Sequence, residues 1–133
     1  MPLKIVIKAG NIELEGILND SPTAKLIWEK LPIESSGNLW GNEIYFSIPV
    51  SSEFDNTARE IVELGDIGYW PTGKAFCIFF GPTPLSEGDE IVPASQVNIV
   101  GRIIGDPTKL KEFEDGDFIT LLPGGSTNDS YSG

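Results

Sequence analysis

The stretch Gly65-Asp-Ile-Gly-Tyr-Trp-Pro-Thr-Gly-Lys-Ala-Phe-Cys-Ile-Phe-Phe-Gly-Pro-Thr-Pro84 is a turn-rich segment that leads into an apolar run and ends in a second turn. Glycines and prolines stand on both sides of residues 75–80, which are rich in aromatic side chains. This run is too short for a helix and lies between turn residues. It therefore predicts a buried strand of a β-barrel.

The composition indicates one acidic domain. A chain of 133 residues can bury a single core of modest size. With 20 acidic residues, 9 basic residues and no histidine, its formal net charge is -11. Phosphate backbones and anionic membrane surfaces would repel such a protein. The expected partner is a peptide or a small molecule, and neither nucleic acid nor a membrane.

The chain shows no sign of a membrane segment or of a common metal site. It has no apolar run of about 18 residues, and residues 1–8 alternate like a strand, so we expect a soluble cytoplasmic protein. The single Cys77 allows no intramolecular disulfide, and the lack of histidine argues against zinc. Carboxylate-bound Ca²⁺ or Mg²⁺ stays open, although no Asp-x-Asp-x-Asp-Gly loop occurs. We expect no metal and no cofactor.

The first third of the chain predicts a hairpin followed by a helix. Residues 4–9 and 11–18 alternate with period two around Gly10-Asn11, with Ile5 and Ile7 on the core face. Ser21-Pro22 is an N-cap followed by proline at the first helical position. The apolar residues that follow lie on one face at helical spacing and predict a short helix ending near Pro32: Ala24, Ile27, Trp28 and Leu31.

The middle of the chain gives one clear strand. Residues 35–38 and 41–42 are turn signals, and residues 43–48 alternate, with Ile44, Phe46 and Ile48 on one face and Tyr45 on the other. The apolar residues of the segment 58–64 fit neither the strand period nor the helical period well, and we favour a strand there.

The remaining segments complete a mainly β architecture. Residues 85–90 predict an acidic surface loop, and residues 97–104 and 117–122 predict strands. Asp106-Pro107 is again an N-cap residue followed by proline at the first helical position, as in Ser21-Pro22. It predicts a second short helix with Leu110 and Phe113 as its buried positions. We predict a closed antiparallel β-barrel with two short helices over its open ends, formed by residues 1–123, and a disordered tail over residues 124–133.

Three stretches resemble the cyclophilins, and more closely the small cyclophilin-like proteins of bacteria and archaea. In residues 10–23 a strand pair leads through an acidic turn and Pro-Thr into a helix, as in the cyclophilin opening. Residues 65–78 resemble the cyclophilin loop Ala-Asn-Ala-Gly-Pro-Asn-Thr-Asn-Gly and the strand Gln-Phe-Phe-Ile after it. Residues 97–105 resemble the strand Val-Val-Phe-Gly-Lys-Val. Residues 42–46, and residues 65–71 together with 76–84, look like signatures of the small cyclophilin-like proteins themselves.

The resemblance implies the barrel, but the catalytic residues of cyclophilins do not carry over. In cyclophilins a Phe-His-Arg strand supplies an arginine that assists rotation about the X-Pro bond. The corresponding strand here, residues 43–49, contains neither arginine nor histidine. The strand glutamine of cyclophilins corresponds to Ala75 and the following pocket phenylalanine to Cys77. Their pocket tryptophan and histidine correspond to Leu85 and, approximately, Val97.

Motif position and side-chain type select six candidate ligand-binding residues: Phe46, Tyr69, Trp70, Phe76, Glu43 and Arg59. Residues 69–71 are expected in a loop, where they either plug the barrel mouth or form a ligand wall. Phe46 and Phe76 are core by default, or line a groove.

Two further features concern polar and reactive side chains. Glu43 and Asp66 could pair with Arg59 or Lys74 in a polar cluster at one barrel end. Cys77 has apolar neighbours and no histidine to activate it, so we expect a buried, inert thiol.

These observations lead to three hypotheses. The first is a binding module for an extended peptide or a small apolar ligand. The alternative is a weak peptidyl-prolyl isomerase in which Arg59, Lys74 or a backbone donor replaces the missing arginine. The third is assembly into a homo-oligomer or a larger complex through exposed aromatic side chains. No catalytic residue can be named from the sequence.

Overall fold

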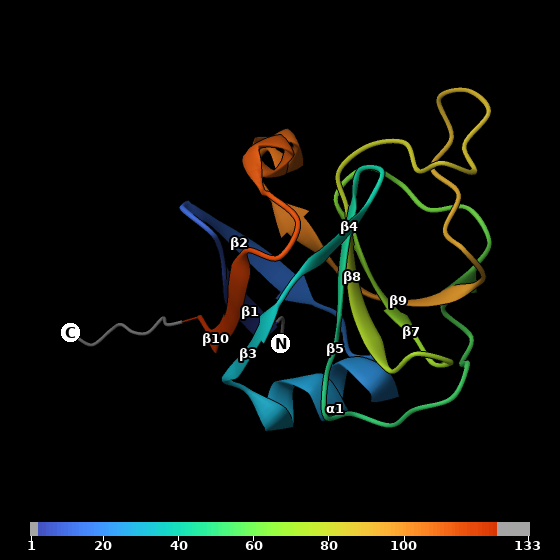
Figure 1. Cartoon of the computed structure of the whole chain (residues 1–133). Helices are drawn as coiled ribbons and strands as arrows, with labels where there is room; N and C mark the ends of the chain where they lie inside the picture. Colours follow the sequence, from blue (N-terminus) through green and yellow to red (C-terminus); the bar gives the residue numbers. More distant parts are fainter. Residues whose placement is uncertain (1–2, 125–133) are drawn as a thin grey trace.

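The computed structural model describes residues 3–124, which form mainly antiparallel strands (Figure 1). The chain opens with the hairpin of β1 (Leu3–Ala9) and β2 (Ile12–Leu18), which turns at residues 10–11. Ile5 and Ile7 are fully buried on its inner face. The predicted hairpin and its core face are confirmed.

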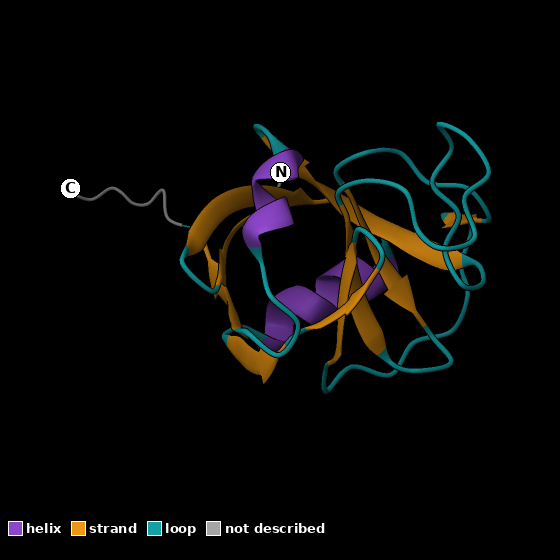
Figure 2. Ribbon diagram, turned by 45° about the horizontal axis from the view of Figure 1, so that its top comes forward, coloured by secondary structure: helices purple, strands orange, loops and turns teal. Residues whose placement is uncertain are grey.

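The other strands join the hairpin in a single 10-stranded sheet. Their bounds are β3 (Ile33–Ser36), β4 (Asn38–Trp40), β5 (Glu43–Ser47), β6 (Ala58–Arg59), β7 (Asp66–Trp70), β8 (Ala75–Phe79), β9 (Val97–Ile104) and β10 (Phe118–Pro123). The strand order is β3-β10-β1-β2-β9-β7-β8-β5-β4, and β6 pairs with β9 beside this path. Figure 2 shows how strongly the sheet curves around its interior.

Two helices lie at opposite ends of the curved sheet, α1 at the bottom and η1 at the top of Figure 1. Helix α1 (Pro22–Lys30) begins as predicted, because the Ser21 hydroxyl accepts a hydrogen bond from the Ala24 amide. Helix η1 (Pro107–Glu112) is capped by Asp106 in the same way, but it is a 3-10 helix. Its expected core positions, Leu110 and Phe113, are buried.

The sheet is not closed into a ring, so the predicted closed barrel is not confirmed. Its two edges, β3 and β4, are joined directly at Gly37. The backbone there bonds to the turn before β10 instead: the Gly37 amide donates to the Asp117 carbonyl, and the Gly116 amide to the Gly37 carbonyl. A Cβ on Gly37 would lie 2.7 Å from the Phe113 ring. The aromatic ring of Phe113 thus packs against the backbone at the point where β3 passes into β4.

Three other local predictions differ from the structure. The turn signals at residues 35–38 lie within the short strands β3 and β4, because pairing with β10 and β5 extends the backbone there. Tyr69 and Trp70 lie on β7 and not in a loop. Of residues 58–64, the described strands include Ala58 and Arg59, and Val62 makes an isolated bridge to Ile91.

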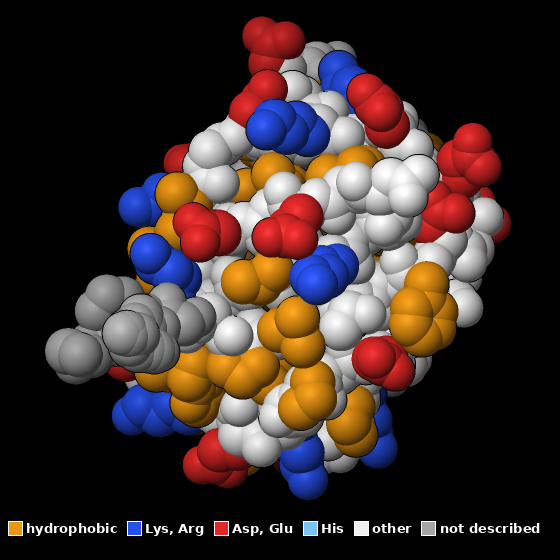
Figure 3. Space-filling model, turned by 90° about the vertical axis from the view of Figure 1, so that its left-hand side faces the viewer, with side chains coloured by type: hydrophobic (Ala, Val, Ile, Leu, Met, Phe, Trp, Pro, Cys, Tyr) orange, Lys and Arg blue, Asp and Glu red, His pale blue; other side chains and the backbone are white. Residues whose placement is uncertain are grey.

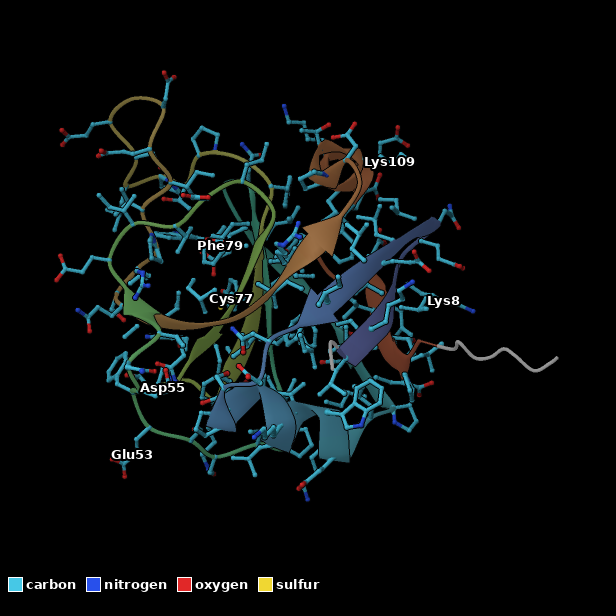
Figure 4. All side chains as sticks on the ribbon, turned by 180° about the vertical axis from the view of Figure 1, so that it is seen from behind. Lys8, Glu53, Asp55, Cys77, Phe79 and Lys109 are labelled. Atoms are coloured by element: carbon cyan, nitrogen blue, oxygen red, sulfur yellow. The ribbon has the colours of Figure 1, made fainter. Side chains whose placement is uncertain are left out.

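Strands β5, β7 and β8 carry side chains on two packed faces. Their inner face belongs to the main core. Their outer face is covered by loops and contributes to a second cluster of buried residues, here called the outer cluster: Val62, Ala75, Cys77, Phe79, Ile91 and Val97. Figure 4 shows Cys77 and Phe79 on the side of the sheet along which the long loops run. A second apolar layer therefore lies outside the sheet.

The next features are one face of the surface and the C-terminal end of the described residues. Figure 3 shows a face on which acidic, basic and hydrophobic side chains are interspersed. Gly124 still bonds to the Lys4 carbonyl, and the rest of the predicted tail lies outside the described residues.

Neither helix within residues 3–124 is long and apolar enough to cross a membrane.

Candidate functional site

A pocket of about 160 Å³ opens between the outer face of the sheet and the loop that precedes β9. Strands β4, β5, β7 and β8 provide its floor and walls, and the loop and the start of β9 provide the opposite side. The lining residues are Trp40, Glu43, Tyr45, Trp70, Cys77, Pro93, Ala94, Ser95 and Val97. The lining is mostly apolar and aromatic with few polar groups, which is the usual character of a small-molecule site.

Glu43 is the acidic group of this pocket. It lies opposite Trp40 on β4 and Phe79 on β8, and only 6% of it is exposed. Within the described part of the chain, its Oε1 atom has no hydrogen-bond partner. Burial raises the pKa of Glu43 from 4.5 to about 7, and the neighbouring Cys77 thiol opposes this shift only in part. Near neutral pH the carboxyl group therefore changes readily between its neutral and anionic forms.

Cys77 contacts the pocket from β8 but is not a reactive thiol. Its Sγ donates to the Ala75 carbonyl oxygen at 3.8 Å, and the residue is almost completely buried. Burial, together with the negative charge of Glu43, raises the pKa of this thiol well above its ordinary value. Because the thiolate is the nucleophilic form, Cys77 acts as a small apolar wall.

Trp70 forms a wall that is held on two sides. Its Nε1–H donates to the Ser95 hydroxyl at 2.6 Å, which ties β7 to the loop. Gly73 lies against its ring, since a Cβ there would come within 2.7 Å of the ring carbons. Only glycine leaves room for this ring position. These two restraints hold the indole in one orientation.

The loop beside the pocket is anchored by its own hydrogen bonds. The Thr83 hydroxyl donates to the Val92 carbonyl, and the Ser86 hydroxyl accepts from the amides of Thr83 and Val92. The Val62–Ile91 bridge fixes the same segment to the preceding loop. These bonds hold Pro93–Ser95 across from the sheet.

Three of the six candidate residues lie outside the pocket, in the main core. Phe46, Tyr69 and Phe76 are at most 1% exposed. The rings of Phe46 and Phe76 pack with their centroids 5.4 Å apart, and the Tyr69 hydroxyl donates to the Val50 carbonyl at 2.5 Å. Their motif position suggested ligand contact, but strand alternation turns them inward. The structure corrects this expectation: these side chains do not line the pocket.

The remaining candidates are divided between two places. Glu43 and Trp70 line the pocket. Arg59 lies in a separate shallow hollow with Asp66. Lys74 lies in the β7–β8 turn. The expected polar cluster around Glu43 and Asp66 is therefore divided: Arg59 lies beside Asp66, whereas Glu43 lines a different cavity.

Several pocket residues were not selected from the sequence, chiefly Trp40, Tyr45 and the segment 93–95. The alternation of residues 43–48 already placed Tyr45 on the face opposite the core. Since Glu43 shares that parity, the pair could have been recognised as one wall. No local pattern indicated residues 93–95, because their position depends on how a long loop folds back.

Comparison with known proteins gives a clear family. The chain matches the family model described as cyclophilin-like over residues 1–122. It is similar to the solution structure of a hypothetical protein from Archaeoglobus fulgidus, with 39% identity and a TM-score of 0.79 over 92% of this chain and 95% of that chain. No curated protein gives a significant match. The chain belongs to the cyclophilin-like family, as the resemblance predicted.

Proposed function

We propose that this protein is a binding module that holds a small ligand, or one side chain of an extended peptide, in the outer pocket. The observation that carries the proposal is a preformed apolar pocket with one buried carboxyl group, Glu43, that lacks a hydrogen-bond partner for Oε1 within the described residues. Unpaired buried polar atoms are costly and rare in native proteins, and a bound ligand is one way to supply the missing partner. An apolar cavity of roughly 150 Å³ can hold a molecule as large as benzene.

Peptidyl-prolyl isomerisation is the alternative activity. Proline rotation needs an apolar pocket and one well-placed donor. A neutral Glu43 carboxyl group is one donor among the lining residues, beside the Tyr45 hydroxyl, whereas Arg59 and Lys74 are not among them. We give this activity second place, since no guanidinium group lies among the described lining residues.

Two-dimensional NMR of the ¹⁵N-labelled protein, titrated with short X-Pro peptides, tests both functions. We expect shifts confined to the strands and loop around the pocket, including the indole N–H groups of Trp40 and Trp70. Exchange spectra of the peptides in the same samples measure isomerisation. Accelerated cis/trans exchange would make the alternative the correct function.

A pair of tryptophan variants separates binding from stability. Trp70→Phe removes a pocket wall and should weaken binding by roughly tenfold, since it deletes aromatic contact area and the link to Ser95. Trp28→Phe is the matched control, because Trp28 is a half-buried residue on α1 that packs against the main core. Equal binding by both variants would contradict the proposed site.

A further inference from the structure

The pocket combines three aromatic walls with a single acidic group. Trp40 on β4, Tyr45 on β5 and Trp70 on β7 are half-buried and line the same cavity. The faces of aromatic rings carry partial negative charge and attract cations within about 6 Å of the ring centre. Several rings around one cavity are the usual recognition site for alkylated ammonium groups.

We propose that this pocket binds a small organic cation, an alkylated ammonium group, with Trp40, Tyr45 and Trp70 as its walls and Glu43 as its counter-charge. This inference rests on the proposed binding function and names the chemical class of the ligand.

The unpaired carboxyl group favours a cationic ligand. Glu43 is more than nine-tenths buried, and no lysine or arginine occurs among the described residues that line the cavity. The other titratable side chains facing it are Tyr45 on β5 and Cys77 on β8, and neither supplies a positive charge. A buried carboxylate without a partner is unfavourable, so a cation that enters the pocket provides the missing charge.

Negative charge around the pocket also favours a cationic ligand. A wider hollow of about 590 Å³ shares Pro93, Ala94 and Ser95 with the pocket, and Glu60, Glu87 and Glu90 also line it. The chain as a whole carries a net charge of -11. This field attracts cations toward the pocket and repels anions from it.

The character of the walls selects the type of cation. Divalent metal ions need several oxygen ligands, whereas this cavity offers one carboxyl group among apolar surfaces. An alkylated ammonium group is weakly hydrated and presents methyl groups to the rings. Its size is close to that of benzene, which a cavity of roughly 150 Å³ accepts.

The experiment compares choline with 3,3-dimethyl-1-butanol, its neutral isostere, by NMR titration of the full chain at pH 8. The indole N–H signals of Trp40 and Trp70 report the pocket, and that of Trp28 is the internal reference. We expect choline to bind at least roughly tenfold more tightly than the alcohol. Glu43→Gln should reduce the difference severalfold, because it removes the counter-charge and leaves the aromatic rings, whereas Glu13→Gln, at an exposed position on β2, should leave the difference unchanged.

The pH dependence of the unmodified protein provides a second test that needs no variant. Since Glu43 has a pKa of about 7, its carboxylate becomes available as the pH rises through neutrality. Choline affinity should therefore rise by about tenfold between pH 6 and pH 8, with little change for the alcohol. Cys77 stays protonated in this range, because its pKa lies well above its ordinary value.

The outcomes separate this inference from the proposed function. Equal affinity for choline and the alcohol, or affinity that falls as the pH rises, would overturn the cation preference. The first result would leave an apolar binding pocket, and the second would leave one in which neutral Glu43 donates a hydrogen bond. Failure of both probes and of the X-Pro peptides to shift the pocket signals would overturn the inference and the proposed function together.

Discussion

The two faces of β5, β7 and β8 are built from similar residue types but pack differently. On the inner face, Phe46, Tyr69 and Phe76 are buried at 1% exposure or less. On the outer face, the larger side chains Tyr45 and Trp70 stay half-buried around a cavity. The inner face closes against the rest of the curved sheet, whereas the outer face is covered by loops that leave a space.

The difference shows how one strand can contribute to the core on one face and line a cavity on the other. Dense packing on the inner face fixes the strands, because interiors of this kind leave few voids. The rigid strands then hold the outer side chains in place with a cavity between them. The buried acid of these strands, Glu43, lies on the outer face beside that cavity.

The largest expected effect comes from truncating the inner face. Phe76→Ala removes a buried ring that packs on Phe46, and should lower the free energy of unfolding by about 3–5 kcal/mol. Trp70→Phe on the outer face should cost less than about 1.5 kcal/mol. Urea unfolding of both variants measures the contrast. If Phe76→Ala does not fold, Phe76→Leu is the milder inner-face variant, and a smaller loss than for Trp70→Phe would contradict the comparison.

An intermediate effect is expected from Glu43 and depends on pH. Its pKa in the folded state, about 7, lies above its ordinary value of 4.5. Between these pH values the folded protein retains a proton that the unfolded chain releases, so the free energy of unfolding falls as the pH rises. The contribution of the Glu43 proton to the free energy of unfolding is fully present below pH 4.5 and is lost above pH 7. The total change is about 3 kcal/mol.

Glu43→Gln should remove this decline and be more stable than the unmodified protein above pH 7. Urea unfolding at pH 5 and pH 8 measures the difference, with Glu13→Gln as the exposed control. Parallel pH dependences for the unmodified protein and Glu43→Gln would show that Glu43 is not a destabilising buried acid.

The smallest effect is expected where the loop meets the sheet. Ser95→Ala removes the acceptor of the Trp70 indole N–H at a position open to water, so stability should change by about 1 kcal/mol or less. The indole loses one of its two restraints, and choline affinity should fall severalfold. Ser35→Ala removes an exposed hydroxyl bond elsewhere and is the control. Unchanged choline affinity in Ser95→Ala would show that Gly73 alone orients the ring.

The sequence by itself determined most of the local structure. The cap and proline at Ser21-Pro22 specified where α1 begins, because these residues satisfy free amides at a helix start. Period-two alternation specified the hairpin and assigned Ile44, Phe46 and Tyr45 to their faces. The sequence determined less about residues 58–64, because their apolar residues follow neither the strand period nor the helical period. Only the pairing of β6 with the distant strand β9 defines a strand there.

The tertiary structure decided the edges of the sheet and the composition of the site. Phe113 packs at Gly37, between the edge strands β3 and β4, although the two residues are 76 positions apart. The pocket brings together Trp40, Glu43, Trp70 and Ser95 from distant segments. Alternation within a strand could identify which side chains share a face. Only the folded loop could determine that the outer face has a cavity, since that depends on packing between segments that are not neighbours in the sequence.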